Sequence, residues 1–180
     1  MKDYAEELDA LIKSQSDSQE IVLVGYSFGG FIARYYAAKH PQRVKGIVLI
    51  DAAHENWLVE MKSLMSDSDW NKMQSILDWF QTTLGHNYWA SQFEMAEAVL
   101  PQSMRVKIVS RGQPHQRIRQ AGISEQGITI YNELHDKYQR AQLTLTFNTS
   151  RVIAKKSEHL IVDSEPDVVM SALTQLINLK

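Results

Sequence analysis

An apolar run, a glycine-rich turn and a helical segment follow one another near the start of the chain. Residues 21–24 are all apolar and mostly β-branched, which is typical of a strand buried on both faces of a parallel sheet. Residues 31–39 have helical character, and the pattern stops before Pro41 because proline disfavours helical geometry in the residue before it. A second, mainly apolar run follows at residues 44–50. This strand–helix–strand unit predicts a parallel sheet with a right-handed crossover, and therefore the α/β fold class.

The turn between the first strand and the helix reads Gly25-Tyr26-Ser27-Phe28-Gly29, a G-x-S-x-G sequence. On such a sharp turn a serine sits in a strained conformation with its hydroxyl exposed. We therefore expect Ser27 to be a nucleophile, with Gly25 and Gly29 removing side chains that would collide where strand and helix approach. The backbone N–H of Phe28 is the expected oxyanion donor, because it lies at the start of the helix and points where negative charge develops.

Other functions of this turn are less well supported by the sequence. The G-x-G-x-x-G pattern and the P-loop lysine are absent, which disfavours a phosphate-binding turn and leaves a turn that binds nothing as the alternative. The chain has no cysteine and no H-E-x-x-H pattern, so we expect neither a metal nor another cofactor. A formal charge of -2 gives no reason to expect nucleic acid or a membrane as partner, and we expect a small ester or acyl substrate.

A serine hydroxyl is a weak nucleophile and needs a base that removes its proton. Of the six histidines, His159 alone directly follows a predicted strand, at residues 151–154, and precedes the final helix. We therefore expect His159 to be the base. His54, shortly after the strand at residues 44–50, is the rival.

The rest of the chain continues the alternation after one interruption. Residues 55–100 carry apolar side chains at helical spacing with no strand pattern, which predicts two or three helices inserted into the fold. Pro166 opens the last helix, at the position where proline is best tolerated. The 180 residues are expected to form a single domain. Besides the segments above, we predict strands at residues 106–109 and 151–154, and helices at the N-terminus, ending in the polar stretch 14–19, at 127–142 and at 167–178.

The chain resembles the α/β-hydrolase superfamily in three segments: VLVGYSFGG at residues 22–30, GIVLID at 46–51 and SEH at 157–159. The resemblance covers nearly the whole chain. It implies a parallel-sheet α/β-hydrolase-like fold in which residues 55–100 are a helical lid over the pocket. The family usually has glycine immediately before the catalytic histidine, whereas this chain has Glu158, whose carboxylate we expect close to the His159 imidazole.

The resemblance also implies an acid that orients the histidine. The family generally takes it from the end of the strand before the last, but in this chain no acid follows that strand until Glu125. Some members instead use the end of the preceding strand, where Asp51 stands. The order Ser27, Asp51, His159 matches the family order of nucleophile, acid and base. We expect Asp51 to be the acid, with Glu125 as an alternative.

The family typically has four strands before the one that carries the nucleophile, whereas here a single helix precedes residue 21. We therefore expect a fold that lacks the N-terminal strands and the loop that normally provides the second oxyanion donor. The expected serine hydrolase would then be impaired, and the alternative is a non-catalytic remnant that serves as a binding or assembly module. The strand at residues 21–24 would form a sheet edge that favours self-association or a partner chain.

Two further observations concern charge and location. Residues 105–119 contain Arg105, Lys107, Arg111, Arg117 and Arg119 and no acid, a cluster more typical of a solvated face than of a site for an anionic substrate. The N-terminus lacks the apolar run of a signal peptide, and no segment reaches the roughly 20 apolar residues of a membrane span. We expect a cytoplasmic protein.

Overall fold

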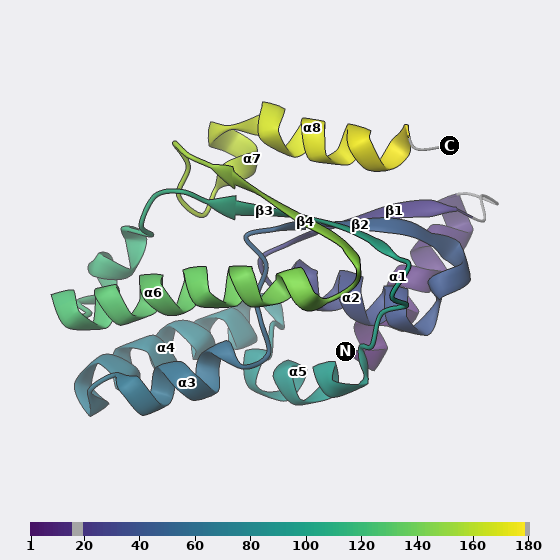
Figure 1. Cartoon of the computed structure of the whole chain (residues 1–180). Coiled ribbons are helices and arrows are strands. Elements are labelled where there is room, and N and C mark those ends of the chain that lie inside the picture. The colour runs from purple at the N-terminus through teal and green to yellow at the C-terminus, as the bar shows by residue number, and fades with distance from the viewer. Residues whose placement is uncertain (16–19, 179–180) are drawn as a thin grey trace.

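A four-stranded parallel sheet forms the centre of the computed structural model, which describes residues 1–15 and 20–178 (Figure 1). Each strand pairs in parallel with the next one along the chain, so the order across the sheet is β1-β2-β3-β4. The predicted α/β class is confirmed. Since all four strands run the same way, their carboxyl ends lie at one edge of the sheet. The strands are β1 (Ile21–Tyr26), β2 (Val44–Ile50), β3 (Arg105–Arg111) and β4 (Asn148–Ala154).

Helices cover both faces of the sheet. The helix α8 lies on one face, and α1, α2 and α6 lie on the other (Figure 1). Four short 3-10 turns connect some of the elements, at Pro41–Arg43, Met95–Glu97, Arg117–Ala121 and Gln142–Thr144. The helices are α1 (Lys2–Gln15), α2 (Gly29–Lys39), α3 (Trp57–Leu64), α4 (Asp67–Leu84), α5 (Tyr88–Glu94), α6 (Glu125–Ala141), α7 (Ile161–Ser164) and α8 (Pro166–Ile177).

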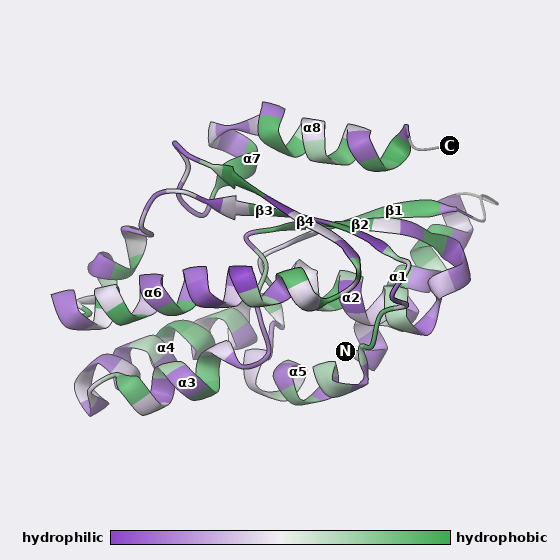
Figure 2. Cartoon of the chain, viewed as in Figure 1, coloured by the Kyte–Doolittle hydropathy of each residue, from purple (hydrophilic) through white to green (hydrophobic). Residues whose placement is uncertain are grey.

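The central strand β2 explains why the apolar runs are continuous. Ile47 and Leu49 belong to the cluster that packs against α1 and α2, whereas Val48 and Ile50 belong to the cluster beneath α8. Successive side chains of a strand point to opposite faces, so a strand buried on both faces needs apolar residues at every position. Figure 2 shows β1 as mainly hydrophobic, whereas hydrophilic and hydrophobic residues alternate along α6.

Most predicted elements are present, with shifted ends. The strand β1 continues through Tyr26 into the turn, and α2 begins at Gly29. The helix α6 begins at Glu125 because Ser124 caps it, its hydroxyl accepting a hydrogen bond from the N–H of Gly127 at 3.1 Å. The predicted end of the first helix falls partly on residues 16–19, which lie outside the described residues.

Residues 55–100 form α3, α4 and α5, with no strand among them, as predicted. Two caps shape this segment. The helix α4 ends at Gly85, whose φ of 73° suits glycine, and α5 begins after Asn87, whose side chain accepts a hydrogen bond from the N–H of Ala90 at 2.9 Å. The two caps therefore end α4 and start α5 within three residues, directly before Tyr88.

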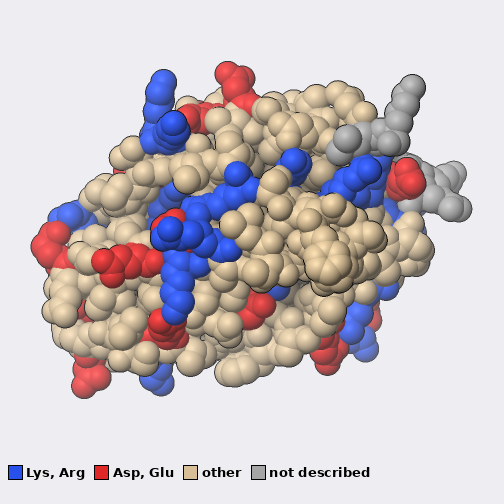
Figure 3. Space-filling model, in the orientation of Figure 1, with Lys and Arg blue, Asp and Glu red and all other residues tan. Residues whose placement is uncertain are grey.

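The predicted edge position of the strand before the G-x-S-x-G turn is confirmed: across the described part of the chain, β1 pairs with β2 alone. The side chain of Val24 on this strand is 48% exposed. Lys and Arg side chains gather over the opposite edge, near β4, on the face seen in Figure 3. Among the helices within residues 1–15 and 20–178, none combines the length and the apolar character needed to cross a membrane.

Candidate active site

Ser27 stands in the tight turn between β1 and α2. Its φ is 52°, in the left-handed region that residues other than glycine seldom adopt. Its N–H donates to the carbonyl of Ile50 at 3.0 Å, and its own carbonyl accepts from the N–H groups of Gly30 at 3.1 Å and Ala53 at 3.0 Å. These bonds offset a backbone strain of about 1–3 kcal/mol. The conformation is the one that the G-x-S-x-G sequence predicts.

The glycines of the turn differ from expectation in one respect. A Cβ on Gly25 would lie 2.6 Å from the carbonyl oxygen of Gly29, so glycine is required there, as expected. A Cβ on Gly29 would meet nothing within 4 Å, so the expected collision at this position is wrong. The close approach is at the next residue, where a Cβ on Gly30 would lie 2.4 Å from the Cβ of Ala52. The helix α2 therefore meets the segment after β2 at Gly30, one residue later than expected.

Asp51 and His159 form a hydrogen-bonded pair at the carboxyl edge of the sheet. Asp51 directly follows β2 with a φ of 43°, and its side chain is fully buried. His159 lies in the loop between β4 and α7, and its Nδ1 is 2.7 Å from Oδ2 of Asp51. Since an ionised carboxylate only accepts, Nδ1 carries the proton of this bond and Nε2 is free to take another. The His159 ring rests on Tyr26, with 4.8 Å between the ring centroids.

Two further groups hold the carboxylate of Asp51. Arg111 donates its backbone N–H to Oδ1 at 3.0 Å and its guanidinium to Oδ2 at 3.2 Å. His135 Nε2 lies 2.8 Å from Oδ1 but makes no hydrogen bond of good geometry with it, so the contact is electrostatic. Burial alone would raise the pKa of Asp51. The contacts with His135 and His159 and the charge of Arg111 outweigh burial and hold that pKa well below its ordinary value.

Sequence reasoning missed the roles of Arg111 and His135. Arg111 is buried against Asp51, so the assignment of residues 105–119 to a solvated face is wrong for this arginine. Its position at the end of β3, beside the end of β2, was the available signal. His135 shares one face of α6 with the buried residues Ile128, Tyr131 and Tyr138, and this helical spacing was its signal.

The rival residues make other contacts. Glu125 is 75% exposed and is paired with Arg119, so the structure does not bring it to His159. His54 lines the same cavity as Ser27, but its Nδ1 accepts the N–H of Asn56 at 3.1 Å. Burial, opposed by Glu55 and assisted by the charge of Arg34, lowers the pKa of His54 to about 4, so this imidazole is neutral.

Glu158, which we expected to lie close to the imidazole of His159, is directed at another segment. Its carboxylate accepts the N–H of Gln116 at 3.0 Å and lies 3.7 Å from Nδ1 of His115. The His115 ring in turn lies 5.4 Å from the His159 ring. Burial and the charges of His159 and Arg111 lower the pKa of His115 to about 4. Glu158 therefore orders the loop after β3.

The hydroxyl of Ser27 is 3.5 Å from the phenol oxygen of Tyr88. Within the described residues it makes no hydrogen bond with His159. The N–H of Phe28 has no hydrogen-bond acceptor in the described part of the chain, and the Phe28 ring is stacked on His86 at 4.4 Å between centroids. An unused N–H at the start of α2 can donate a hydrogen bond to a ligand oxygen.

A cavity of about 890 Å³ joins these groups. Ser27, Asp51 and His159 lie in its wall, together with apolar side chains of α4 such as Ile76 and Phe80. It extends between the carboxyl edge of the sheet and the helices of residues 55–100. Within residues 1–15 and 20–178, no group of three His, Cys, Asp or Glu side chains is arranged to hold a metal ion.

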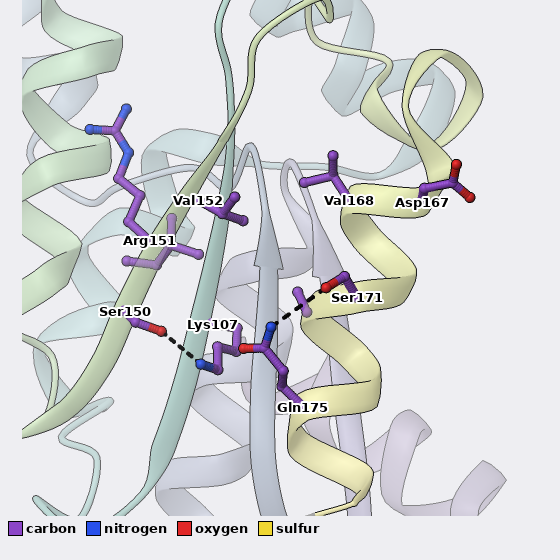
Figure 4. A pocket seen from close by; sticks show the side chains of 10 residues that line it. Lys107, Ser150, Arg151, Val152, Asp167, Val168, Ser171 and Gln175 are labelled. Carbon is purple, nitrogen blue, oxygen red and sulfur yellow. Dashed lines mark hydrogen bonds between the residues drawn. The ribbon is translucent and has the colours of Figure 1, made fainter.

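A second cavity, of about 360 Å³, lies between α8 and the strands β3 and β4 (Figure 4). Lys107 Nζ donates to Ser150 Oγ at 2.9 Å in its wall, and Gln175 faces Ser171 at 3.5 Å. Its described wall contains serines but no histidine that could activate them. The larger cavity is therefore the candidate active site.

Comparison with known proteins agrees with this architecture. The family model described as alpha/beta hydrolase fold matches residues 1–163. A curated relative, the cis-3-alkyl-4-alkyloxetan-2-one decarboxylase of Shewanella oneidensis, is 35% identical over 51 residues, which are 28% of this chain and 16% of that protein.

Solved structures share the fold at low identity. A probable hydrolytic enzyme of Pseudomonas aeruginosa is 13% identical with a TM-score of 0.61, over 97% of this chain and 68% of that one. A carboxylesterase of Nitrososphaera gargenis is 15% identical with a TM-score of 0.57, over 98% of this chain and 72% of that one. An alpha/beta hydrolase enzyme from a lagoon-sediment metagenome has 66% of its length covered, so the chain spans about two thirds of such structures. From the family match over residues 1–163, the chain belongs to the alpha/beta hydrolase fold family.

Proposed function

We propose that the protein is a serine hydrolase that cleaves esters or similar acyl compounds. Ser27 would be the nucleophile, His159 the base and Asp51 the acid that orients it. The observation that carries the proposal is the 2.7 Å bond between His159 Nδ1 and Asp51 Oδ2, in the wall of the cavity that also contains the strained Ser27. A buried aspartate with a lowered pKa is an anion at neutral pH and can stabilise an imidazolium.

In the proposed reaction, the Ser27 hydroxyl turns from Tyr88 towards His159 and attacks the acyl carbon. His159 Nε2 takes the hydroxyl proton, and Asp51 stabilises the positive ring. The negatively charged oxygen of the tetrahedral intermediate accepts a hydrogen bond from the N–H of Phe28. His159 then returns the proton to the leaving alcohol, and a water molecule, activated by the same histidine, hydrolyses the acyl-enzyme.

The apolar side chains in the wall of the cavity suit a substrate with an apolar acyl group. Ile76, Leu77 and Phe80 of α4 and Trp57 of α3 face the same space as Ser27. Such a surface binds hydrocarbon by removing it from water, at about 25 cal/mol for each Å². We propose that residues 55–100 are the lid over this site. The names carboxylesterase and esterase among the solved structures of the same fold are consistent with an ester substrate.

A fluorophosphonate probe tests the proposal, because it reacts with an activated serine. The wild-type chain should be labelled at Ser27, and Ser27→Ala and His159→Ala should lose the label. Ser63→Ala is the matched control, since this exposed serine of α3 bonds only the Glu60 carbonyl, at 2.8 Å. A folded wild-type chain that stays unlabelled would contradict the proposal.

The alternative is a hydrolase-like binding module without catalysis. The observation in its favour is that the Ser27 hydroxyl faces Tyr88 and makes no hydrogen bond with His159 among the described residues. Catalytic hydrogen bonds are often loose before substrate binds, so this geometry is compatible with both functions. Binding of an unreactive ester analogue by a chain that the probe does not label would favour the module.

A further inference from the structure

A tyrosine of the segment 55–100 reaches the nucleophile. Tyr88 OH lies 3.5 Å from Ser27 Oγ, and the Tyr88 side chain is 8% exposed. An O–H···O hydrogen bond is usually close to 2.7 Å, so this contact is weak. The phenol therefore lies beside the Ser27 hydroxyl in a weak contact, and its O–H can donate a hydrogen bond to another oxygen instead.

The backbone holds Tyr88 in place from both sides. Gly85 ends α4 in a left-handed conformation, and Tyr4 of α1 donates a hydrogen bond to the Gly85 carbonyl. Asn87 caps α5, so Tyr88 is its first residue, and the Tyr88 N–H donates to the His86 carbonyl at 3.2 Å. Tyr88 thus lies where the helices α1, α4 and α5 meet.

Aromatic rings fix the direction of the phenol. The Tyr88 ring packs edge-on against Phe28 at 4.9 Å, against Phe80 at 5.8 Å and against Phe31 at 6.4 Å between centroids. The phenol therefore lies beside both Ser27 and the ring of Phe28, the residue whose N–H has no acceptor among the described residues. A donor held in advance costs no reorganisation when charge develops on the substrate.

The phenol also remains a donor over a wide pH range. Burial raises the pKa of Tyr88 above its ordinary value, and the contact with Ser27 opposes burial only in part. The hydroxyl therefore keeps its proton at neutral and mildly alkaline pH.

We propose that Tyr88 OH is a second oxyanion donor, which acts together with the N–H of Phe28 on the tetrahedral intermediate formed at Ser27. This inference rests on the proposed serine hydrolase function. An oxyanion donor must come within roughly 2.7–3.1 Å of the charged oxygen. That oxygen is bonded to the same carbon as Oγ, so a phenol 3.5 Å from Oγ can reach it without movement of the backbone. The proton stays on the phenol, and no bond is broken.

The test is the Tyr88→Phe variant, assayed with p-nitrophenyl butyrate. Loss of one oxyanion donor is expected to lower kcat by about 10²-fold, while KM changes by less than about threefold, because the donor acts only in the transition state. Affinity for a phenylboronic acid that adds to Ser27 should fall by a similar factor, since this adduct imitates the intermediate. Tyr35→Phe is the matched control: this buried tyrosine of α2 lies outside the cavity wall and should keep full activity.

The outcomes separate the two proposals. An unlabelled, inactive wild-type chain would overturn the hydrolase function and this inference with it. An active wild-type chain with an equally active Tyr88→Phe variant would overturn the inference alone. A change in KM without a change in kcat would make Tyr88 a binding residue and would also overturn it, as would an equal loss of activity in Tyr35→Phe.

Discussion

His159 and Asp51 are separated by 108 positions in the chain, and Nδ1 of the histidine lies 2.7 Å from Oδ2 of the aspartate. The pair connects the ends of β2 and β4, which are not adjacent strands. Arg111, at the end of the intervening β3, bonds the same carboxylate. The three strand ends are thus joined through one buried carboxylate, and stability and chemistry depend on the same group.

Replacing Asp51 should abolish most activity. In Asp51→Asn the amide cannot hold the positive imidazole, so ester turnover should fall by about four orders of magnitude. The buried guanidinium of Arg111 loses the negative charge beside it, which costs roughly 3–5 kcal/mol of unfolding free energy. Glu125→Gln is the control, because this carboxylate is 75% exposed. Turnover and urea unfolding check both effects, and loss of turnover in Glu125→Gln alone would refute the assignment of Asp51.

Acid should destabilise the fold through His54. Its pKa is about 4 in the folded chain, so below the ordinary value near 6.5 the unfolded chain binds more protons. Unfolding free energy should therefore fall as pH drops from about 6.5 to 4, by roughly 1–3 kcal/mol for this residue. Urea unfolding of wild type and His54→Gln over that range measures it. The same pH slope in both proteins would contradict the prediction.

The two adjacent glycines of the turn should respond differently to alanine. Gly30→Ala places a Cβ 2.4 Å from the Cβ of Ala52, and the shift that this requires should cost about 1–3 kcal/mol of unfolding free energy. Gly29→Ala meets nothing within 4 Å and should leave stability unchanged or slightly higher. Thermal unfolding of both variants checks the difference. Equal losses would show that the packing between α2 and the segment after β2 is not the cause.

The edge strand β1 should cause association. An apolar strand edge presents unpaired backbone groups, and a lysine on it opposes pairing. We expect the chain to associate in sedimentation experiments at concentrations on the order of tens of micromolar, and Val24→Lys to remain monomeric. Val59→Lys is the control, because this valine of α3 is similarly exposed, at 52%, but lies outside the sheet. A stable wild-type monomer would rule the prediction out.

Much of this architecture was predictable because the signals are local. Apolar runs predicted all four strands, and G-x-S-x-G predicted the strained turn at Ser27. His159 was singled out by its place after a strand, and Asp51 by the family resemblance. The two lie together because the carboxyl ends of parallel strands meet at one edge. Gly29 was misjudged because a motif specifies small residues but not which one the neighbouring segment approaches.

The amino-acid sequence by itself determined the strands, the turn and the identity of a serine, an aspartate and a histidine at strand ends. Only the tertiary structure decided what surrounds them. Arg111 and His135 meet Asp51 because strand register and the rotation of α6 bring them there. Tyr88 meets Ser27 because the caps at Gly85 and Asn87 place it at the start of α5, where its ring packs against Phe28. Such contacts join residues distant in sequence, and side-chain packing, which no local pattern encodes, selects them.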